Sequence, residues 1–145
     1  GSGTLSKDTE VILTEAMEIY KETDGLFDVT IYPLMQLWGF PTQEYHVPAK
    51  SELQEALAKV DASQVVIDGN QVSLGTNQEM DLGGIAKGYT SARVMEIFRK
   101  YGITSGMVSL GGNVQTLNTR PDGKPWNPES QWAAGFSPGS PVCGK

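Results

Sequence analysis

Residues 81–88 read Asp81-Leu82-Gly83-Gly84-Ile85-Ala86-Lys87-Gly88. The short apolar stretch 80–82 comes before the paired glycines and is interpreted as the end of a β-strand. Apolar residues at helical spacing follow it and predict a helix over about 85–101, with Gly102 just after its end. The most glycine-rich part of the chain is therefore expected at the N-terminus of a helix.

Two further helices are predicted upstream of this segment. Ser6 is a suitable capping residue for a helix over 7–22, and Gly25 is expected to stop it. Ser51 is expected to cap a second helix over 52–60. The residues expected to face the core are Leu13, Ala16, Met17 and Tyr20 in the first helix, and Leu53, Ala56, Leu57 and Val60 in the second.

Short β-branched runs separated by turn residues predict two β-hairpins. Residues 65–67 and 72–74 flank the first turn, and 107–110 and 113–117 flank Gly111-Gly112. Because helices and strands come in separate stretches, the expected fold class is α+β.

Composition limits the classes of partner. The 145 residues carry 11 Lys and Arg against 17 Asp and Glu, a net charge of −6, which argues against nucleic acid as a partner. This balance leaves room for a small anion in a local pocket. No apolar run approaches the roughly 18 residues of a membrane span. Glycine is unusually frequent, with 17 residues, and glycine allows backbone to approach a ligand closely.

The two ends are interpreted separately from the domain. Residues 1–3 resemble an expression scar, and residues 127–145 have the proline and glycine content of an irregular tail. The domain would then occupy 4–126. We expect Cys143, the single cysteine, to be inert and His46 to lie at the surface rather than in a catalytic site.

The paired glycines before a helix predict a phosphate-binding site. Free N–H groups at a helix N-terminus attract phosphate, Lys87 adds a positive charge, and Asp81 can accept from a ribose or ring N–H. The alternative is that the glycines only permit close packing of a helix on a strand. The Gly111-Gly112 turn has the same two interpretations, a ligand contact or an ordinary hairpin turn.

An aromatic segment over 24–40 adds a third feature. Phe27, Trp38 and Phe40 are typical of a core, but beside Asp24 and Asp28 they are also suited to an aromatic cofactor pocket.

Together these segments resemble the ApbE family of FAD:protein FMN transferases. The resemblance rests on four stretches in family order: Asp24-Gly25-Leu26-Phe27-Asp28-Val29-Thr30 with Pro33-Leu34 and Leu37-Trp38-Gly39-Phe40; Asp81 to Tyr89; Leu110-Gly111-Gly112-Asn113; and the turn Arg120 to Trp126. It covers about residues 5–126 and implies an ApbE-like, T-fold-like α+β domain, truncated, with a mixed sheet and flanking helices.

The resemblance implies a reaction and a set of site residues. Family members bind FAD and usually Mg²⁺, transfer FMN to a Thr or Ser hydroxyl of a target flavoprotein and release AMP, although some hydrolyse FAD instead. Carried over to this chain, the FAD contacts are Leu26, Phe27, Asp28, Asp81, Lys87, Gly111 and Gly112. Gly84 would offer its carbonyl to the metal, and no catalytic residue is assigned.

The resemblance also implies features that this sequence does not show. They are the lipoprotein signal and first pocket residues, a later Asp-Ala-x-x-Thr-like motif that supplies metal ligands, and a downstream histidine. We therefore expect a central fragment, inactive or weakly active by itself, of an extracytoplasmic, lipid-anchored protein of the periplasm or cell envelope. The alternatives are a non-catalytic FAD-binding module, an FAD pyrophosphatase, or an interaction domain without a ligand.

Overall fold

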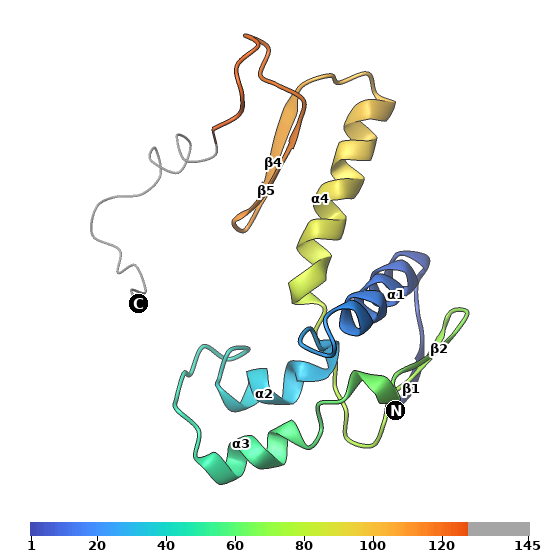
Figure 1. Cartoon of the computed structure of the whole chain (residues 1–145), viewed down its shortest axis with the longest axis vertical. Coiled ribbons are helices and arrows are strands. Elements are labelled where there is room, and N and C mark those ends of the chain that lie inside the picture. Colours follow the sequence, from blue (N-terminus) through green and yellow to red (C-terminus); the bar gives the residue numbers. More distant parts are fainter. Residues whose placement is uncertain (128–145) are drawn as a thin grey trace. The chain divides into compact units, whose positions relative to one another are not determined.

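The computed structural model describes residues 1–127 and divides into two compact units, residues 1–86 and the residues from Lys87 onward (Figure 1). The expected α+β class is confirmed, and both sheets formed by residues 1–127 are antiparallel. Within these residues no helix combines the length and the apolar character needed to cross a membrane. The predicted tail and Cys143 lie, apart from Asn127, outside the described residues.

A small sheet organises the first unit. Strands β2 (Val66–Asp68) and β3 (Gln71–Ser73) form the predicted hairpin around Gly69-Asn70. Each strand lies one residue nearer to the turn than predicted. Strand β1 (Ser2–Thr4) pairs with the other edge of β3, so that Gly3 lies opposite Val72. Residues 2 and 3 of the segment interpreted as an expression scar therefore take part in the sheet.

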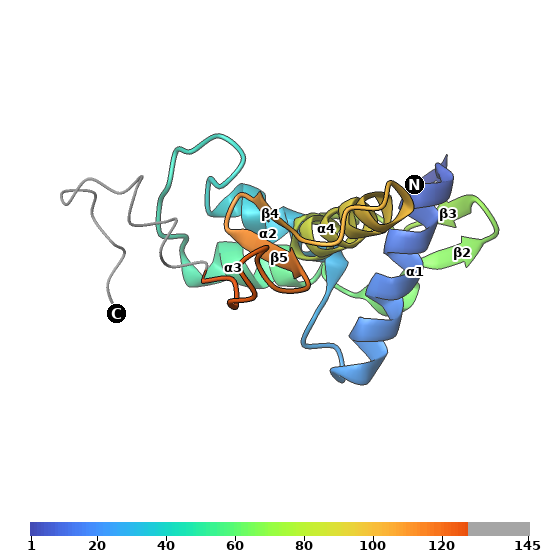
Figure 2. The ribbon, with the colours of Figure 1, turned by 90° about the horizontal axis from the view of Figure 1, so that it is seen from above.

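Helix α1 (Lys7–Glu22) has the predicted bounds and covers this sheet (Figure 2). The hydroxyl of Ser6 accepts a 3.2 Å hydrogen bond from the backbone N–H of Thr9, which confirms the predicted cap. Leu13 and Ala16 are completely buried. With Val29, Val65 and Val72 they form the core cluster of the unit.

The end of α1 agrees with the prediction that Gly25 stops the helix. Asp24 and Gly25 both have left-handed backbone conformations, with φ of +50° and +81°. The N–H of Gly25 donates to the carbonyl of Tyr20 at 2.8 Å and so closes the turn after the helix.

One short helix lies within the aromatic segment of residues 24–40, and a second follows it. A 3-10 turn, η1 (Val29–Ile31), leads into α2 (Tyr32–Leu37), and α3 (Lys50–Leu57) packs beside α2. Residues 26–40 are thus made up of turns and short helices.

The prediction for the second helix was partly wrong. Helix α3 begins at Lys50 because Glu52 accepts a 2.7 Å hydrogen bond from the backbone N–H of Ala49, so Ser51 lies inside the first turn and not at the cap. Ala56 is buried as expected, whereas Leu57, expected to face the core, is 53% exposed. A further 3-10 turn, η2 (Ala62–Gln64), precedes β2.

Helix α4 (Gly83–Lys100) begins in the first unit and continues into the second. Residues 80–82 form no strand, contrary to the prediction, because Met80 and Leu82 pack their side chains against the core cluster without pairing with another strand. The helix starts two residues earlier than expected. Its C-terminal end is as predicted: Gly102 has φ of +73°, and the N–H of Ile103 donates to the carbonyl of Phe98 at 2.9 Å.

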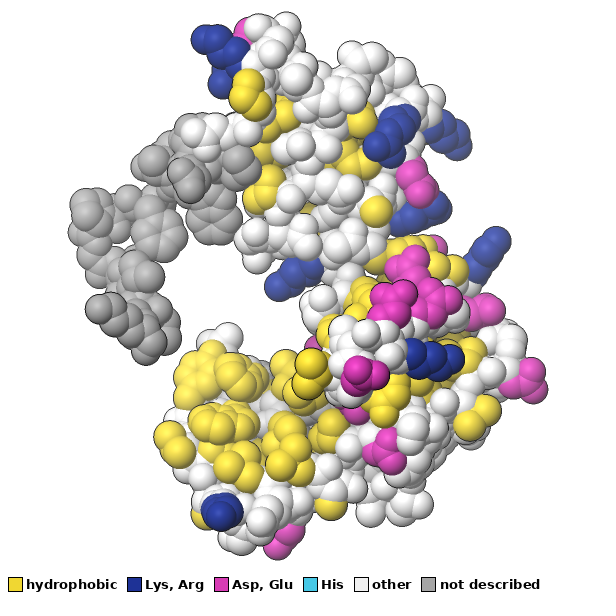
Figure 3. Space-filling view, viewed as in Figure 1, with side chains coloured by type: hydrophobic (Ala, Val, Ile, Leu, Met, Phe, Trp, Pro, Cys, Tyr) yellow, Lys and Arg dark blue, Asp and Glu magenta, His cyan; other side chains and the backbone are white. Residues whose placement is uncertain are grey.

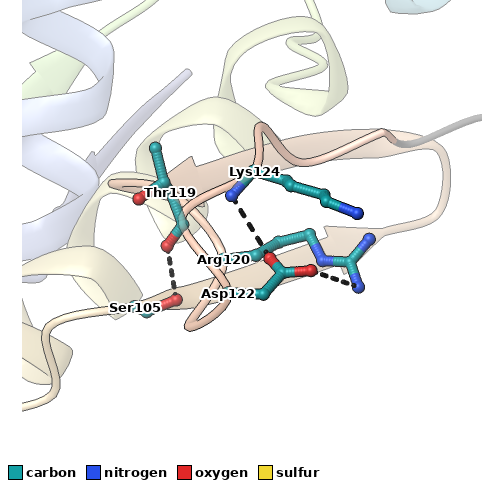
Figure 4. Close-up of polar contacts among 5 residues, drawn as sticks. All are labelled: Ser105, Thr119, Arg120, Asp122 and Lys124. Atoms are coloured by element: carbon teal, nitrogen blue, oxygen red, sulfur yellow. Dashed lines mark hydrogen bonds and ion pairs between the residues drawn. The ribbon is translucent and has the colours of Figure 1, made fainter.

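The second unit contains the predicted second hairpin, formed by β4 (Gly106–Leu110) and β5 (Asn113–Leu117). Gly111 and Gly112 have φ of +53° and +94°, values suited to the two central residues of a tight hairpin turn. The open end is closed by the hydroxyl of Ser105, which donates to the carbonyl of Thr119 at 2.6 Å (Figure 4).

The predicted turn after β5 is confirmed. The N–H of Arg120 donates to the carbonyl of Lys124 at 2.9 Å, and Gly123 has φ of +78°. The Asp122 carboxylate lies 3.4 Å from the Arg120 guanidinium and accepts a 3.2 Å hydrogen bond from the N–H of Lys124 (Figure 4).

Candidate functional site at the glycine-rich helix start

The start of α4 is capped from one side by Asp81. Its Oδ1 atom accepts a 2.8 Å hydrogen bond from the N–H of Gly83, and the N–H groups of Ile85 and Ala86 donate to the carbonyl of Leu82. The N–H of Gly84, an exposed residue, has no acceptor within residues 1–127. An unpaired N–H at a helix N-terminus is suited to an anion.

Gly84 lies against the ring of Phe27. A Cβ atom at residue 84 would be 3.0 Å from Cε2 of Phe27, closer than such atoms normally approach. Because φ of Gly84 is not positive, its backbone conformation accepts any residue, and a side chain at this position would press on the Phe27 ring. Phe27 itself packs against the core cluster, whereas the neighbouring Leu26 is 91% exposed.

Asp28, predicted to line the flavin pocket, binds protein donors with both carboxylate oxygens. Its Oδ1 accepts from the N–H of Thr30 at 2.7 Å and from the Thr30 hydroxyl at 2.6 Å. Its Oδ2 accepts from the N–H of Ala62 at 2.9 Å. Thr30 is completely buried and did not figure among the predicted site residues, although Asp-x-Thr spacing is typical of such local side-chain turns.

Lys87 and the Gly111 turn come together in the second unit. Lys87 is exposed, and its Cε and Nζ atoms lie 3.8 and 3.9 Å from the position that a Cβ atom of residue 111 would occupy. The hydroxyl of Ser91, one turn further along α4, donates to the carbonyl of Lys87 at 2.8 Å and lies 3.5 Å from Oδ1 of Asn113. Ser91 is completely buried, so this contact joins helix and hairpin.

Charge is distributed unevenly along the chain. The charged residues of 87–127 are Lys87, Arg93, Arg99, Lys100, Arg120 and Lys124 against Glu96 and Asp122. This stretch is net positive although the whole chain has a charge of −6. Lysine and arginine also outnumber acidic side chains on the face of this unit seen in Figure 3. The sequence prediction treated the cations as scattered and missed this concentration, which counting by segment would have found.

The described residues hold no ready-made metal cluster. Among residues 1–127 no three His, Cys, Asp or Glu side chains lie close enough together to bind an ion. Gly84 was predicted to offer its carbonyl, but a carbonyl in the first turn of a helix also accepts from the N–H four residues later. One lone pair of the Gly84 carbonyl oxygen then remains for a metal ion. Asp81 is the carboxylate nearest to Gly84 in sequence.

The aromatic side chains that follow α2 lie largely at the surface. Trp38 is 36% exposed and Phe40 52% exposed, and the rings of Phe40 and Tyr45 meet edge to face with centroids 5.7 Å apart. Figure 3 shows apolar side chains gathered over this part of the first unit. His46 is exposed, as predicted. A separate cavity of about 590 Å³, lined by residues of α1, η2 and β2, contains none of the predicted site residues.

Comparison with known proteins identifies the group to which this architecture belongs. The ApbE family model matches residues 1–130. The chain is 30% identical over 129 residues to the FAD:protein FMN transferase of Haemophilus influenzae, an alignment that covers 84% of this chain and 37% of that protein. It is 33% identical over 125 residues to the Vibrio cholerae protein of the same name, with the same coverage.

Solved structures agree. The flavin transferase ApbE from Vibrio cholerae superposes with a TM-score of 0.79 at 32% identity, over 87% of this chain and 42% of that one. The ApbE protein from Thermotoga maritima gives 0.78 at 31% identity, over 86% and 41%. The chain thus spans about two-fifths of the length of the relatives that it matches. With a sequence match along residues 1–130 and a shared fold, the chain belongs to the ApbE family.

Proposed function

We propose that this chain is part of an FAD:protein FMN transferase. The whole protein binds FAD and Mg²⁺ and moves FMN onto a Thr or Ser hydroxyl of a target flavoprotein. The hydroxyl oxygen attacks the phosphorus of the FMN half and loses its proton. The bond from that phosphorus to the bridging oxygen breaks, and AMP leaves with that oxygen.

The helix start at Gly84 is the observation that carries this proposal. Its N–H lacks an acceptor within residues 1–127, and Lys87 follows one turn later in a stretch of net positive charge. These are the features that a pyrophosphate requires. Relatives that match most of this chain are named FAD:protein FMN transferase.

Each predicted site residue has a role in this proposal. In the first unit, the N–H of Gly84 is the proposed pyrophosphate contact. In the second unit, the ammonium of Lys87 and the backbone of the Gly111-Gly112 turn are the proposed FAD contacts. Asp81 keeps its second oxygen, Oδ2, available for the nucleotide. Phe27 and the exposed Leu26 offer apolar surface to the flavin ring. Asp28, the next residue, supports this segment through its hydrogen bonds to Thr30 and Ala62.

A bound Mg²⁺ would neutralise charge on the pyrophosphate. The Gly84 carbonyl is the ligand proposed within the described residues. Because Mg²⁺ takes six oxygen ligands, phosphate oxygens, waters and groups from the rest of the relatives' length would complete its coordination.

We also propose that the whole protein acts outside the cytoplasm and is anchored to a membrane by a lipid. The family resemblance supports this proposal. Fractionation of cells that make the whole protein tests it, with recovery in the membrane fraction after removal of the cytoplasm as the expected result. Recovery with the cytoplasm would contradict it.

Product analysis tests the reaction. This chain, and the same residues within a protein of the relatives' length, are incubated with FAD, Mg²⁺ and a candidate target. AMP is measured by chromatography and covalent flavin by in-gel fluorescence. We expect the longer protein to release AMP and label the target, and this chain alone to bind FAD without turnover. Equal turnover by both would show that the essential groups lie within this chain.

The same measurement separates the alternatives. AMP release with free FMN and an unlabelled target indicates FAD hydrolysis. FAD binding without AMP release by the longer protein indicates a non-catalytic FAD-binding module. Absence of FAD binding by both proteins leaves an interaction domain and defeats the proposed function.

A further inference from the structure

A buried polar network supports the segment that carries Phe27. Besides its contacts to Asp28, the Thr30 hydroxyl accepts a 2.8 Å hydrogen bond from the N–H of Asp61. Gln78, only 7% exposed, donates to the carbonyl of Asp61 at 2.7 Å and accepts from the N–H of Gly75 at 2.8 Å. The side chains of Asp28, Thr30 and Gln78, here called the polar network, therefore connect three segments of the first unit, residues 28–30, 61–62 and 75–78.

The same segment is attached to the glycine-rich segment through the backbone. The carbonyl of Val29, a residue of the core cluster, accepts a 2.8 Å hydrogen bond from the N–H of Asp81. Two residues before Val29 is Phe27, whose ring lies against Gly84. The hydrogen bonds of the polar network hold the side chains of Asp28 and Thr30, and the N–H of Asp81 binds the carbonyl of Val29 between them. These contacts hold residues 28–30 in place and so fix the position of the adjacent Phe27.

Each member of the polar network is difficult to replace. The two oxygens of Asp28 accept three hydrogen bonds, and the Thr30 hydroxyl both donates to Asp28 and accepts from Asp61. Removing the hydroxyl leaves the partly buried N–H of Asp61 without its acceptor. Buried donors without acceptors are costly, so the loops are expected to shift rather than stay in place.

We propose that Asp28 and Thr30 are positioning residues of the flavin site. They hold Phe27 against Gly84 and so fix the apolar wall beside the N–H of Gly84. This inference rests on the proposed function for its consequence, flavin binding, but not for its structural part. It assigns to Asp28 a role that acts through Phe27, and it adds Thr30, which was not among the predicted site residues.

A double-mutant cycle between residues 30 and 84 tests the structural part without any ligand. Alanine usually stabilises a helix relative to glycine, but at residue 84 its methyl group meets the Phe27 ring. We expect Gly84→Ala to lower the urea midpoint of the unsubstituted chain and of Thr30→Ser, which keeps the hydroxyl. In Thr30→Val, which keeps the shape but lacks the hydroxyl, Phe27 can move and the loss should be smaller.

Additive effects of Thr30→Val and Gly84→Ala would overturn the proposal. If Thr30→Val does not fold, Gln78→Leu takes its place. That substitution removes the hydrogen bond to the Asp61 carbonyl while Asp28 and Thr30 remain, so the coupling to Gly84→Ala should persist at a smaller size. Additivity there would equally overturn the proposal.

FAD titration followed by flavin fluorescence tests the functional part. We expect Thr30→Val to raise the dissociation constant about tenfold, and Thr30→Ser to stay within about twofold, on the scale of one hydrogen bond. Ala56→Gly, a substitution in α3 outside the core cluster and the polar network, controls for lost stability and should leave the constant unchanged. Coupling in the cycle with unchanged FAD affinity in Thr30→Val would overturn the positioning role in the flavin site. If neither the unsubstituted chain nor the longer protein binds FAD, the proposed function fails, and the cycle alone decides whether the network positions Phe27.

Discussion

The Oδ1 atom of Asp81 accepts a 2.8 Å hydrogen bond from the backbone N–H of Gly83. One oxygen of this carboxylate is therefore used to begin α4, and the other is left for a ligand. The capping role and the proposed FAD contact depend on different properties of the side chain, since an amide oxygen can cap but carries no charge.

Substitution of Asp81 separates these two roles. Asp81→Ala should lower the free energy of unfolding by about 1 kcal/mol because the N–H of Gly83 loses its acceptor, while Asp81→Asn should stay close to the unsubstituted chain. Urea unfolding followed by circular dichroism measures this difference. Equal destabilisation by both variants would show that the charge, and not the hydrogen bond, stabilises the helix start.

Lys87 is expected to contribute to FAD binding through its charge. Lys87→Ala should weaken binding by about 1–3 kcal/mol, the scale of a hydrogen bond to a charged group. Lys100→Ala is the matched control, because it removes the same charge from the other end of the same helix. Calorimetry with FAD measures both, and equal affinities for the unsubstituted chain and Lys87→Ala would remove Lys87 from the site.

Magnesium is expected to bind weakly when FAD is absent. One carboxylate and one carbonyl are few ligands for an ion that requires six oxygens, and residues 1–127 bring no three acidic, His or Cys side chains together. Titration of the ligand-free chain with Mg²⁺ should therefore give no heat at micromolar concentrations. A submicromolar site would mean that the ligands have been assigned to the wrong residues.

Ionisation of the Asp61 carboxyl is expected to make the free energy of unfolding depend on pH. Hydrogen bonds from the side chains of Ser63 and Gln64 lower the pKa of the Asp61 carboxyl below its ordinary value. A carboxyl whose folded pKa lies below its unfolded pKa stabilises the fold above the unfolded value, and this contribution is lost as the pH falls through the folded pKa. The urea midpoint of the unsubstituted chain should fall more steeply below the ordinary carboxyl pKa than that of Asp61→Asn. Parallel profiles for the two proteins would contradict this assignment.

Local signals in the sequence predicted the parts of the fold that depend on neighbouring residues. The bounds of α1 followed from Ser6 and the spacing of apolar residues, and the second hairpin followed from Gly111-Gly112. The strand at 80–82 was wrong because apolar alternation indicates burial but does not show which backbone groups pair.

The environment of Asp28 lay beyond local reasoning. Its partner Ala62 is 34 residues away along the chain, and no sequence pattern near Asp28 predicts that contact. The same holds for Phe27 and Gly84: the sequence predicted each as a site residue, and only the fold shows that one explains the other.

The hairpin of β4 and β5 has a consequence for the behaviour of the protein in solution. These strands pair only with each other among residues 1–127, so each has an outer edge whose N–H and C=O groups meet no other strand. Such edges accept any extended peptide by backbone hydrogen bonds, whatever its side chains, including the same hairpin of another copy. Concentrated solutions are therefore expected to form reversible oligomers through strand pairing, and light scattering should rise with concentration before any loss of secondary structure.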